Sequence, residues 1–429
     1  MELMLFGGLL LLLIAIGLPI ALSIGLTAIA VMAIQRGILA LPYAVLAQRM
    51  MYGVNSFPIL AIPFFLLAGK LMNTGGITEK IFQFACKIAG WWPGGLGHVN
   101  VLASIIFAGM SGSAVADAAG LGTIEIKAML DAGYDREFSA AVTAASSVIG
   151  PIIPPSIPLV IFGVMGEVSI GALLIGGIIP GLMIGISMML LIFWTARSKQ
   201  YPVHPRPKVK EVVQSFFDAF PALLTPAILI GGIFSGIFTP TEAAAVCVLY
   251  ALIISVFLYR EISWTDLQRI MTETLRDSAM ILFIIACAAL YAWVLIRLRI
   301  PIILAEKVFQ VSNDPLTILL ILNLFFLVVG CFMESLAAIT ILTPILVPLC
   351  SQVGIDPLHL GLVMVLNLMI GLLTPPVGMC LYAVCRVADL SFEQVVRAII
   401  PFYIPLLAVL MLITLFPGFV TFLPRLVFG

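Results

Sequence analysis

The chain has 429 residues, of which 62% are hydrophobic and only 10% are charged, and its formal net charge is zero. A water-soluble domain needs many more polar and charged side chains to cover its surface. The composition therefore predicts a helical protein that crosses a lipid bilayer several times, and the balanced charge gives no indication of a nucleic-acid partner.

Apolar stretches of about the length that crosses a bilayer occur along the whole chain. We expect spans or half-spans at about 4–34, 57–73, 95–109, 138–166, 170–196, 218–236, 240–259, 278–299, 315–333, 335–350, 356–385 and 395–423. Four amphipathic stretches between them are expected to lie as helices at the membrane interface. These are residues 41–52, 78–88, 264–275 and 303–311.

A pattern of glycine and proline occurs twice at a constant offset of 221 positions, with Gly109 and Gly150 recurring as Gly330 and Gly371. We predict a first repeat over residues 1–200, a connector over 201–217 and a second repeat over 218–429. Gly/Pro-broken apolar segments at equivalent places in two halves indicate a secondary transporter with a binding site near the bilayer midplane.

The hydrophilic region 197–212 predicts the orientation of the chain, because its basic part, Arg197–Lys210, contains no acidic residue. The positive-inside rule places such a loop in the cytoplasm. If the repeats are inverted, each has an odd number of crossings and both termini lie on the periplasmic side. A parallel repeat is the alternative.

The first segment with candidate chemistry runs from Gly109 to Asp117 and includes Ser111, Gly112 and Ser113. Irregular backbone at membrane depth is tolerated where it is buried in protein or lines a cavity. Its hydroxyl and carbonyl oxygens suit a small hard cation, although a tight helix crossing would also favour these small residues. The repeat pattern favours the tip of a re-entrant hairpin.

The second segment has four prolines between Pro151 and Pro158, too many for a continuous helix. A discontinuous helix would present free carbonyl groups for a cation at one half-helix end and free N–H groups for a carboxylate at the other. Ser156 is placed to cap the second half. A kinked but continuous helix is the alternative.

The second repeat has the same break, with Thr374, Pro375 and Pro376 after Gly371. Opposite it stands the segment Gly330–Ser335, in which Glu334 occupies the place of Ser113. Acidic residues within a membrane are costly and suggest function. Asp117 and Glu334 could gate the site, bind a cation or cap helices.

An enzymatic interpretation is weak. Gly109–Gly112 matches the G-x-S-G of rhomboid-type intramembrane proteases, but none of His98, His204 and His359 follows the pattern that would supply a general base. The sequence has no Walker or zinc motif, so we expect neither an enzyme nor direct use of ATP.

The motifs G-M-S-G-S-A-V-A-D, G-P-I-I-P-P-S-I-P, F-T-P-T-E-A and G-L-L-T-P-P-V-G-M resemble those of the large membrane subunit of tripartite ATP-independent periplasmic (TRAP) transporters. The resemblance covers essentially the whole chain. It implies an all-α polytopic membrane protein of the ion-transporter type, with two re-entrant hairpins, two discontinuous helices and an elevator movement. It also implies Na⁺ coupling in the bacterial inner membrane, a small four-helix membrane subunit and a periplasmic binding protein.

The resemblance also implies site residues. One sodium site would use Ser111, Ser113 and the carbonyl groups near Gly150, Ile153 and Pro155. The second, placed mainly by the internal repeat, would use Gly330, Met333, Gly371, Thr374 and Pro376. Substrate contacts would come from Asp117, Pro154, Ser156, Glu334 and Pro375. Glu334 departs from the family, in which Asp is commoner at this position.

We therefore predict sodium-coupled uptake of an organic acid of the C4-dicarboxylate or sialic acid type, delivered by the binding protein. Since Met1 is followed directly by the first span, the small subunit is expected to be a separate polypeptide. The alternatives are a substrate-gated channel and an anion/sodium symporter that needs no binding protein.

Overall fold

The computed structural model describes residues 2–74, 76–199, 201–203, 205–300, 312 and 314–429, and all regular elements within these ranges are helices. Eight of the helical segments in these ranges are long and apolar enough to cross a membrane. The prediction of an all-α polytopic membrane protein is therefore confirmed.

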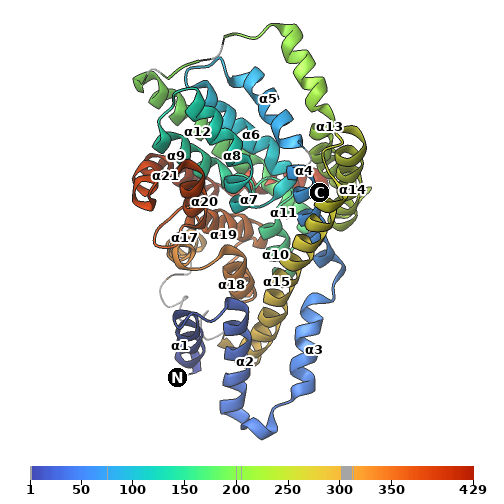
Figure 1. Cartoon of the computed structure of the whole chain (residues 1–429). Helices are drawn as coiled ribbons and strands as arrows, with labels where there is room; N and C mark the ends of the chain where they lie inside the picture. Colours follow the sequence, from blue (N-terminus) through green and yellow to red (C-terminus); the bar gives the residue numbers. More distant parts are fainter. Residues whose placement is uncertain (1, 75, 200, 204, 301–311, 313) are drawn as a thin grey trace.

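One set of helices, called here the frame group, comes from the first part of each predicted repeat. Its helices are α1 (Glu2–Ala15), α2 (Ile20–Arg36), α3 (Tyr43–Val54), α4 (Ala61–Thr74), α13 (Val209–Phe234), α14 (Pro240–Ile253) and α15 (Trp264–Arg297). Helix α15 packs against α2, α3 and α4, and α14 packs against α4 and α13. In Figure 1 these helices form one side and one end of an elongated molecule.

A second set of helices, called here the hairpin group, packs around the two glycine- and proline-rich segments. In the first half they are α6 (Gly95–Ser111), α7 (Ala114–Ala119), α8 (Leu121–Asp131), α9 (Arg136–Ser147), α10 (Ile157–Gly166), α11 (Ile170–Gly176) and α12 (Ile178–Lys199). In the second half they are α17 (Pro315–Phe332), α18 (Ser335–Gln352), α19 (Pro357–Gly371), α20 (Met379–Ala388), α21 (Phe392–Leu415) and α22 (Gly418–Phe428). Helix α5 (Ile77–Ala89) lies between the groups and contacts both α6 and α13.

Several predicted boundaries differ from the structure. The expected span 4–34 is two helices, because Pro19 cannot donate a backbone hydrogen bond and Gly17 has a positive φ of 90°. The stretch 264–275 is the beginning of the 34-residue helix α15 rather than a separate helix. The span 395–423 is likewise interrupted between α21 and α22, where Pro417 stands. The expected helix over 303–311 lies outside the described residues.

Up to α21, the elements in the two halves of the hairpin group follow the same order. Helices α7 and α8 cover residues 114–131 and α18 covers 335–352, which are equivalent ranges at the predicted offset. Each half then has a helix that ends before the Pro-Pro pair and a second helix that begins after it. Both Pro-Pro peptide bonds, Pro154–Pro155 and Pro375–Pro376, are cis.

The two halves exchange contacts across their breaks. Helix α10, which follows the first break, packs against α18 of the second hairpin. Helix α20, which follows the second break, packs against α7 of the first hairpin. This reciprocal packing brings the two hairpin tips and the two breaks to one region of the molecule.

Candidate functional site

The first hairpin tip turns at Gly112, whose φ of 61° lies in the left-handed region. A Cβ at this position would lie 2.5 Å from the carbonyl oxygen of Pro155, so only glycine lets the tip approach the first break this closely. Ser113 then caps α7 by accepting a hydrogen bond from the N–H of Ala116. The structure thus places the first tip, at Gly112, directly against Pro155 of the first break.

A buried carboxylate lies behind this tip. The Ser111 hydroxyl donates a hydrogen bond to Oδ1 of Asp117, and both side chains are buried. Asp117 Oδ2 has no hydrogen-bond partner among the described residues. It faces the backbone of Gly150, where a Cβ would lie 2.3 Å from this oxygen.

The first break is fully enclosed, as a dry binding site requires. Ile153, Pro154 and Pro155 are all buried. Ser156 donates to the carbonyl group of Pro151 and caps α10 by accepting from the N–H of Leu159 at 3.2 Å. The predicted discontinuity and the predicted cap are both present.

The second tip and break meet through their backbones. A Cβ on Gly371 would lie 2.5 Å from the Cα of Gly330, and the N–H of Val377 donates to the carbonyl group of Cys331 at 3.3 Å. The Thr374 hydroxyl donates to the Ile370 carbonyl group at 2.9 Å. This break is more open than the first, because Pro375 is half-buried and Pro376 is exposed.

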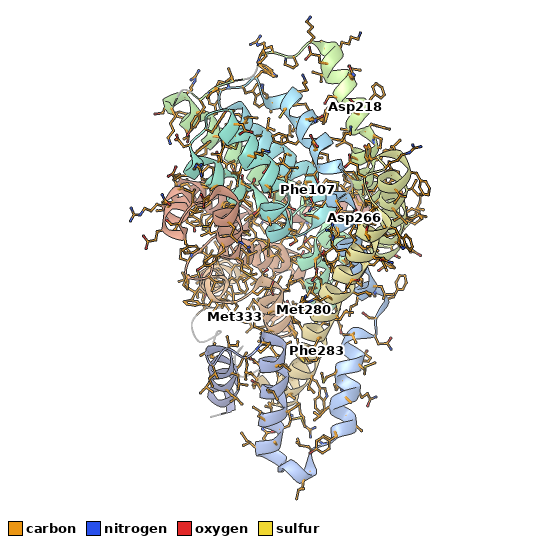
Figure 2. All side chains as sticks on the ribbon, viewed as in Figure 1. Phe107, Asp218, Asp266, Met280, Phe283 and Met333 are labelled. Atoms are coloured by element: carbon orange, nitrogen blue, oxygen red, sulfur yellow. The ribbon has the colours of Figure 1, made fainter. Side chains whose placement is uncertain are left out.

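Glu334 caps α18 from the second tip. Its two carboxylate oxygens accept hydrogen bonds from the N–H groups of Leu336 and Ala337, at 3.0 and 2.9 Å. Met333, the residue before it, is labelled in Figure 2. It lines a different, apolar cavity together with residues of α1, α15, α17 and α18. Sequence reasoning left the role of Glu334 open, and its position combines capping with access to the cavity described next.

A cavity of about 110 Å³ lies where the two hairpins and the two breaks converge. Gly112 and Ser113 line it from the first tip, and Glu334 and Ser335 line it from the second. Pro151 and Leu372 come from the breaks. We call this cavity the tip cavity. Of the fifteen predicted site residues, only Ser113 and Glu334 are among its lining residues. The other thirteen, Asp117 and Met333 among them, are not.

Two further lining residues, Leu66 of α4 and Ile281 of α15, belong to the frame group. Sequence reasoning missed them because apolar residues in apolar spans carry no local signal. The tip cavity is therefore bounded by both groups of helices.

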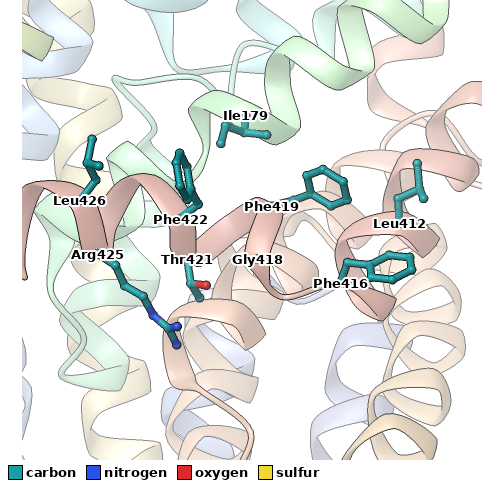
Figure 3. A pocket seen from close by; sticks show the side chains of 9 residues that line it. All are labelled: Ile179, Leu412, Phe416, Gly418, Phe419, Thr421, Phe422, Arg425 and Leu426. Atoms are coloured by element: carbon teal, nitrogen blue, oxygen red, sulfur yellow. The ribbon is translucent and has the colours of Figure 1, made fainter.

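A larger cavity of about 890 Å³ lies along α22, and none of its lining residues belongs to either break. Its walls are mostly aromatic and aliphatic, as Figure 3 shows for Phe416, Phe419 and Phe422. Arg425 is its one charged lining residue. It lacks the converging oxygen atoms that an ion needs, so we place the functional site at the tip cavity.

The residues at the first tip fit a sodium ion. Na⁺ prefers oxygen ligands, and buried hydroxyl, carboxylate and carbonyl oxygens of Ser111, Asp117 and Pro155 lie in this region. A buried carboxylate oxygen without a partner is costly unless a proton or a cation accompanies it. Asp117 Oδ2 is such an atom.

Comparison with known proteins gives a consistent result. The family described as "Tripartite ATP-independent periplasmic transporter, DctM component" matches residues 7–419. The sialic acid TRAP transporter large permease protein SiaM of Vibrio cholerae is 46% identical over 413 residues, which are 96% of each chain. The sialic acid TRAP transporter permease protein SiaT of Haemophilus influenzae is 43% identical over 88% of this chain and 62% of that protein.

More distant relatives are named for other acids. The C4-dicarboxylate TRAP transporter large permease protein DctM of Pseudomonas aeruginosa is 39% identical over 89% of both chains. Among solved structures, the Alcanivorax borkumensis YdaH transporter superposes with a TM-score of 0.62 at 14% identity, over 86% of this chain and 87% of its own. That likeness concerns the fold alone. The named relatives are transporter permeases rather than enzymes.

Proposed function

We propose, from the premise that this chain belongs to the TRAP transporter family as a DctM component, that it couples Na⁺ entry to the uptake of an organic acid across the bacterial inner membrane. The observation that supports this best is the convergence of two hairpin tips and two broken helices on one cavity. An arrangement of this kind holds ions and a carboxylate without a water-filled pore.

The first sodium ion would be held by Ser111, Ser113 and carbonyl groups near Gly150, Ile153 and Pro155. The second would be held by carbonyl groups near Gly330, Met333, Gly371 and Pro376 and by Thr374. Bound Na⁺ supplies positive charge beside buried oxygens. The chain's own contribution is to fix those oxygens in place through the close contacts of Gly112 with Pro155 and of Gly330 with Gly371.

The substrate carboxylate would bind at the beginnings of helices that face the tip cavity. Helix α10 begins after Ser156 beside the first break, and Ile157 lines the cavity. The free N–H groups and the dipole of a helix N-terminus favour an anion. Pro154 and Pro375 would shape the breaks. Asp117 would place a carboxylate oxygen beside the first sodium ion, and Glu334 would hold the beginning of helix α18 by capping it.

Coupling requires that Na⁺ bind the loaded and empty states with different affinity, because equal affinity would shift no equilibrium. We propose that the hairpin group moves against the frame group as an elevator, since the cavity is lined by both. The basic connector would face the cytoplasm and both termini the periplasm. As in the sialic acid transporters named above, the substrate would be of the sialic acid type, with C4-dicarboxylates as the second class.

Proteoliposomes provide the test. The chain would be reconstituted with its small four-helix membrane subunit, and the periplasmic binding protein loaded with labelled acid would be added outside. Uptake should require an inward Na⁺ gradient and should saturate with substrate. Equal uptake with K⁺ in place of Na⁺ would overturn the proposal.

The same assay separates the alternatives. A substrate-gated channel would give flux that grows with concentration without saturating. A binding-protein-independent anion/sodium symporter would give full Na⁺-dependent uptake when the binding protein is omitted. The tip cavity disfavours a channel, because its volume of about 110 Å³ is small for a continuous polar pore.

A further inference from the structure

A second cavity adjoins the tip cavity on the frame side of the first hairpin. It has a volume of about 160 Å³, and we call it the side cavity. Leu66 and Ser113 line both cavities, so the two are neighbours across these two side chains. The remaining walls come from α4, α15 and the first hairpin: Gly69, Lys70, Asn73, Asp277, Phe107, Ser111 and Ala116.

Lys70 and Asp277 line the side cavity and belong to an ion cluster that also includes Glu273. Lys70 Nζ lies 2.5 Å from Oδ2 of Asp277 and 3.5 Å from Oε2 of Glu273. The Lys70 side chain remains 25% exposed, so a ligand in the cavity can reach it. A charged residue in the otherwise apolar helix α4 is costly, which is a reason to look for a function.

The cluster is held against the hairpin tip. A Cβ on Gly69, the residue before Lys70, would lie 3.0 Å from the carbonyl oxygen of Met110 and 3.3 Å from the Cα of Ser111. Asn73 lies one turn further along α4, and its Oδ1 accepts a hydrogen bond from Thr78 at 3.3 Å. Among the described residues its amide N–H groups have no hydrogen-bond acceptor.

The charge of the cluster selects among acids. Lys70 carries one positive charge, whereas Asp277 and Glu273 together carry two negative charges. Among the described residues that line either cavity, Lys70 is the one basic side chain, and it is already paired. A second carboxylate on the substrate would have to displace Asp277 and would be repelled by Glu273.

Hydroxyl and amide groups on a substrate would match the wall of the side cavity formed by Lys70, Asn73 and Asp277. The Lys70 ammonium and the Asn73 amide donate hydrogen bonds, and the Asp277 carboxylate accepts them. A neutral polar tail therefore finds both kinds of partner without adding charge.

We propose that the Lys70–Asp277–Glu273 cluster is a substrate-tail subsite, which makes the chain selective for a monocarboxylic acid with a hydroxyl-rich tail over a dicarboxylic acid. This inference rests on the proposed function, since it takes the substrate carboxylate to lie in the tip cavity. The tail would then pass Ser113 and Leu66 and end against Lys70. Lys70 would be a specificity-determining residue supplied by the frame group.

Calorimetric titration of the complex between this chain and its small subunit, in lipid nanodiscs with saturating NaCl, tests the subsite without the binding protein. The probes are N-acetylneuraminate, a monocarboxylate with a hydroxyl-rich tail, and succinate, a C4-dicarboxylate. We expect N-acetylneuraminate to bind at least tenfold more tightly than succinate. Lys70→Gln should weaken the binding of N-acetylneuraminate about tenfold and leave the binding of succinate weak. Lys70→Arg should retain part of the affinity for N-acetylneuraminate.

The double variant Asp277→Asn/Glu273→Gln tests the charge argument with Lys70 left in place. It frees the ammonium group, so succinate should bind about tenfold more tightly than in the unaltered complex. The matched control is Lys87→Gln, which removes another interhelix ion pair, 3.0 Å from Glu211, whose residues line neither cavity. It should change neither affinity.

The outcomes separate this inference from the proposed function. If N-acetylneuraminate binds in a Na⁺-dependent way but Lys70→Gln behaves like Lys87→Gln, the subsite is wrong and the proposed function stands. Equal binding of succinate and N-acetylneuraminate by the unaltered complex also overturns the subsite. If neither acid binds with Na⁺ present, the proposed function itself fails. Melting temperatures of the ligand-free variants identify any variant that is misfolded. If Lys70→Gln is misfolded, succinate binding by the double variant Asp277→Asn/Glu273→Gln decides whether the subsite exists.

Discussion

Ser111 holds one oxygen of a buried carboxylate whose other oxygen has no partner among the described residues. Ser111→Ala would leave both carboxylate oxygens of Asp117 without a hydrogen-bond partner among the described residues. Hydrogen bonds to charged groups are worth about 1.5–3 kcal/mol, so we expect the Na⁺ concentration for half-maximal uptake to rise tenfold or more. Ser187→Ala is the control, because Ser187 donates only to the Ile184 carbonyl group of its own helix. An unchanged sodium requirement in Ser111→Ala would remove Ser111 from the site.

Asp135, in the turn before α9, supports a pH prediction. Hydrogen bonds from Lys199 at 2.5 Å and Tyr201 at 2.7 Å lower the pKa of its carboxyl group. A lowered pKa in the folded state means that the contribution to stability is present above the unfolded pKa of about 4 and is lost as the pH falls below it. Because these groups are largely exposed, the contribution should stay below about 1 kcal/mol.

The measurement is the melting temperature of the purified protein. Asp135→Asn should melt slightly below the unaltered protein at pH 7, and the two should converge as the pH falls below about 4. A difference that persists at low pH would mean that Asp135 acts through packing rather than charge.

Single residues differed in how well sequence could place them. Ser156 was predicted as a cap because a hydroxyl directly after prolines and before an apolar run is a local signal, and the structure has that cap. Asp117 lies in the predicted segment but behind the tip, since its side-chain direction depends on packing against Gly150. Lys70 carried a usable signal, a lone charge in an apolar helix, but it lies outside the repeated glycine and proline motifs.

At the scale of elements, the second tip and break depend on two glycines in backbone contact. Gly371→Ala would place a Cβ 2.5 Å from the Cα of Gly330, and backbone cannot yield as a flexible side chain does. We expect a loss of about 1–3 kcal/mol in stability and a marked loss of Na⁺-dependent uptake. Gly231→Ala is a matched control in α13, where a Cβ would meet nothing within 4 Å.

That control should be neutral or slightly stabilising, since alanine is favoured over glycine in a helix. Thermal melting and uptake would be measured on both variants. Normal uptake by Gly371→Ala would show that the close approach of Gly330 and Gly371 is unnecessary for transport.

The discontinuous helices and hairpins could be predicted because prolines and glycines act locally, through missing donors and missing side chains. Helix α15 could not be delimited in the same way, because its charged first turns, stabilised by the Ser263–Asp266 capping box, join an apolar span without a breaker. The reciprocal packing of α10 on α18 and of α20 on α7 is a tertiary property. The sequence repeat made it plausible but did not specify the partners.

At the scale of the whole molecule, the elevator proposal requires the first hairpin to leave its contact with α13. A Cβ on Gly109 would lie 2.5 Å from the Cβ of Pro226, so the double variant Gly109→Cys/Pro226→Cys should form a disulfide after a small adjustment toward the usual Cβ–Cβ distance of about 3.5–4.5 Å. The bond would link the hairpin group to the frame group. We expect oxidation to arrest Na⁺-driven uptake and reduction to restore it.

The matched control joins two helices of the frame group. In Gly25→Cys the new Cβ would lie 3.6 Å from the Cβ of the native Cys287, within the normal range for a disulfide. Because α2 and α15 would stay together throughout an elevator cycle, this cross-link should leave uptake intact. Transport that continues through an intact 109–226 cross-link would mean that the hairpin need not slide past α13, and that access to the tip cavity alternates through smaller movements within the hairpin group.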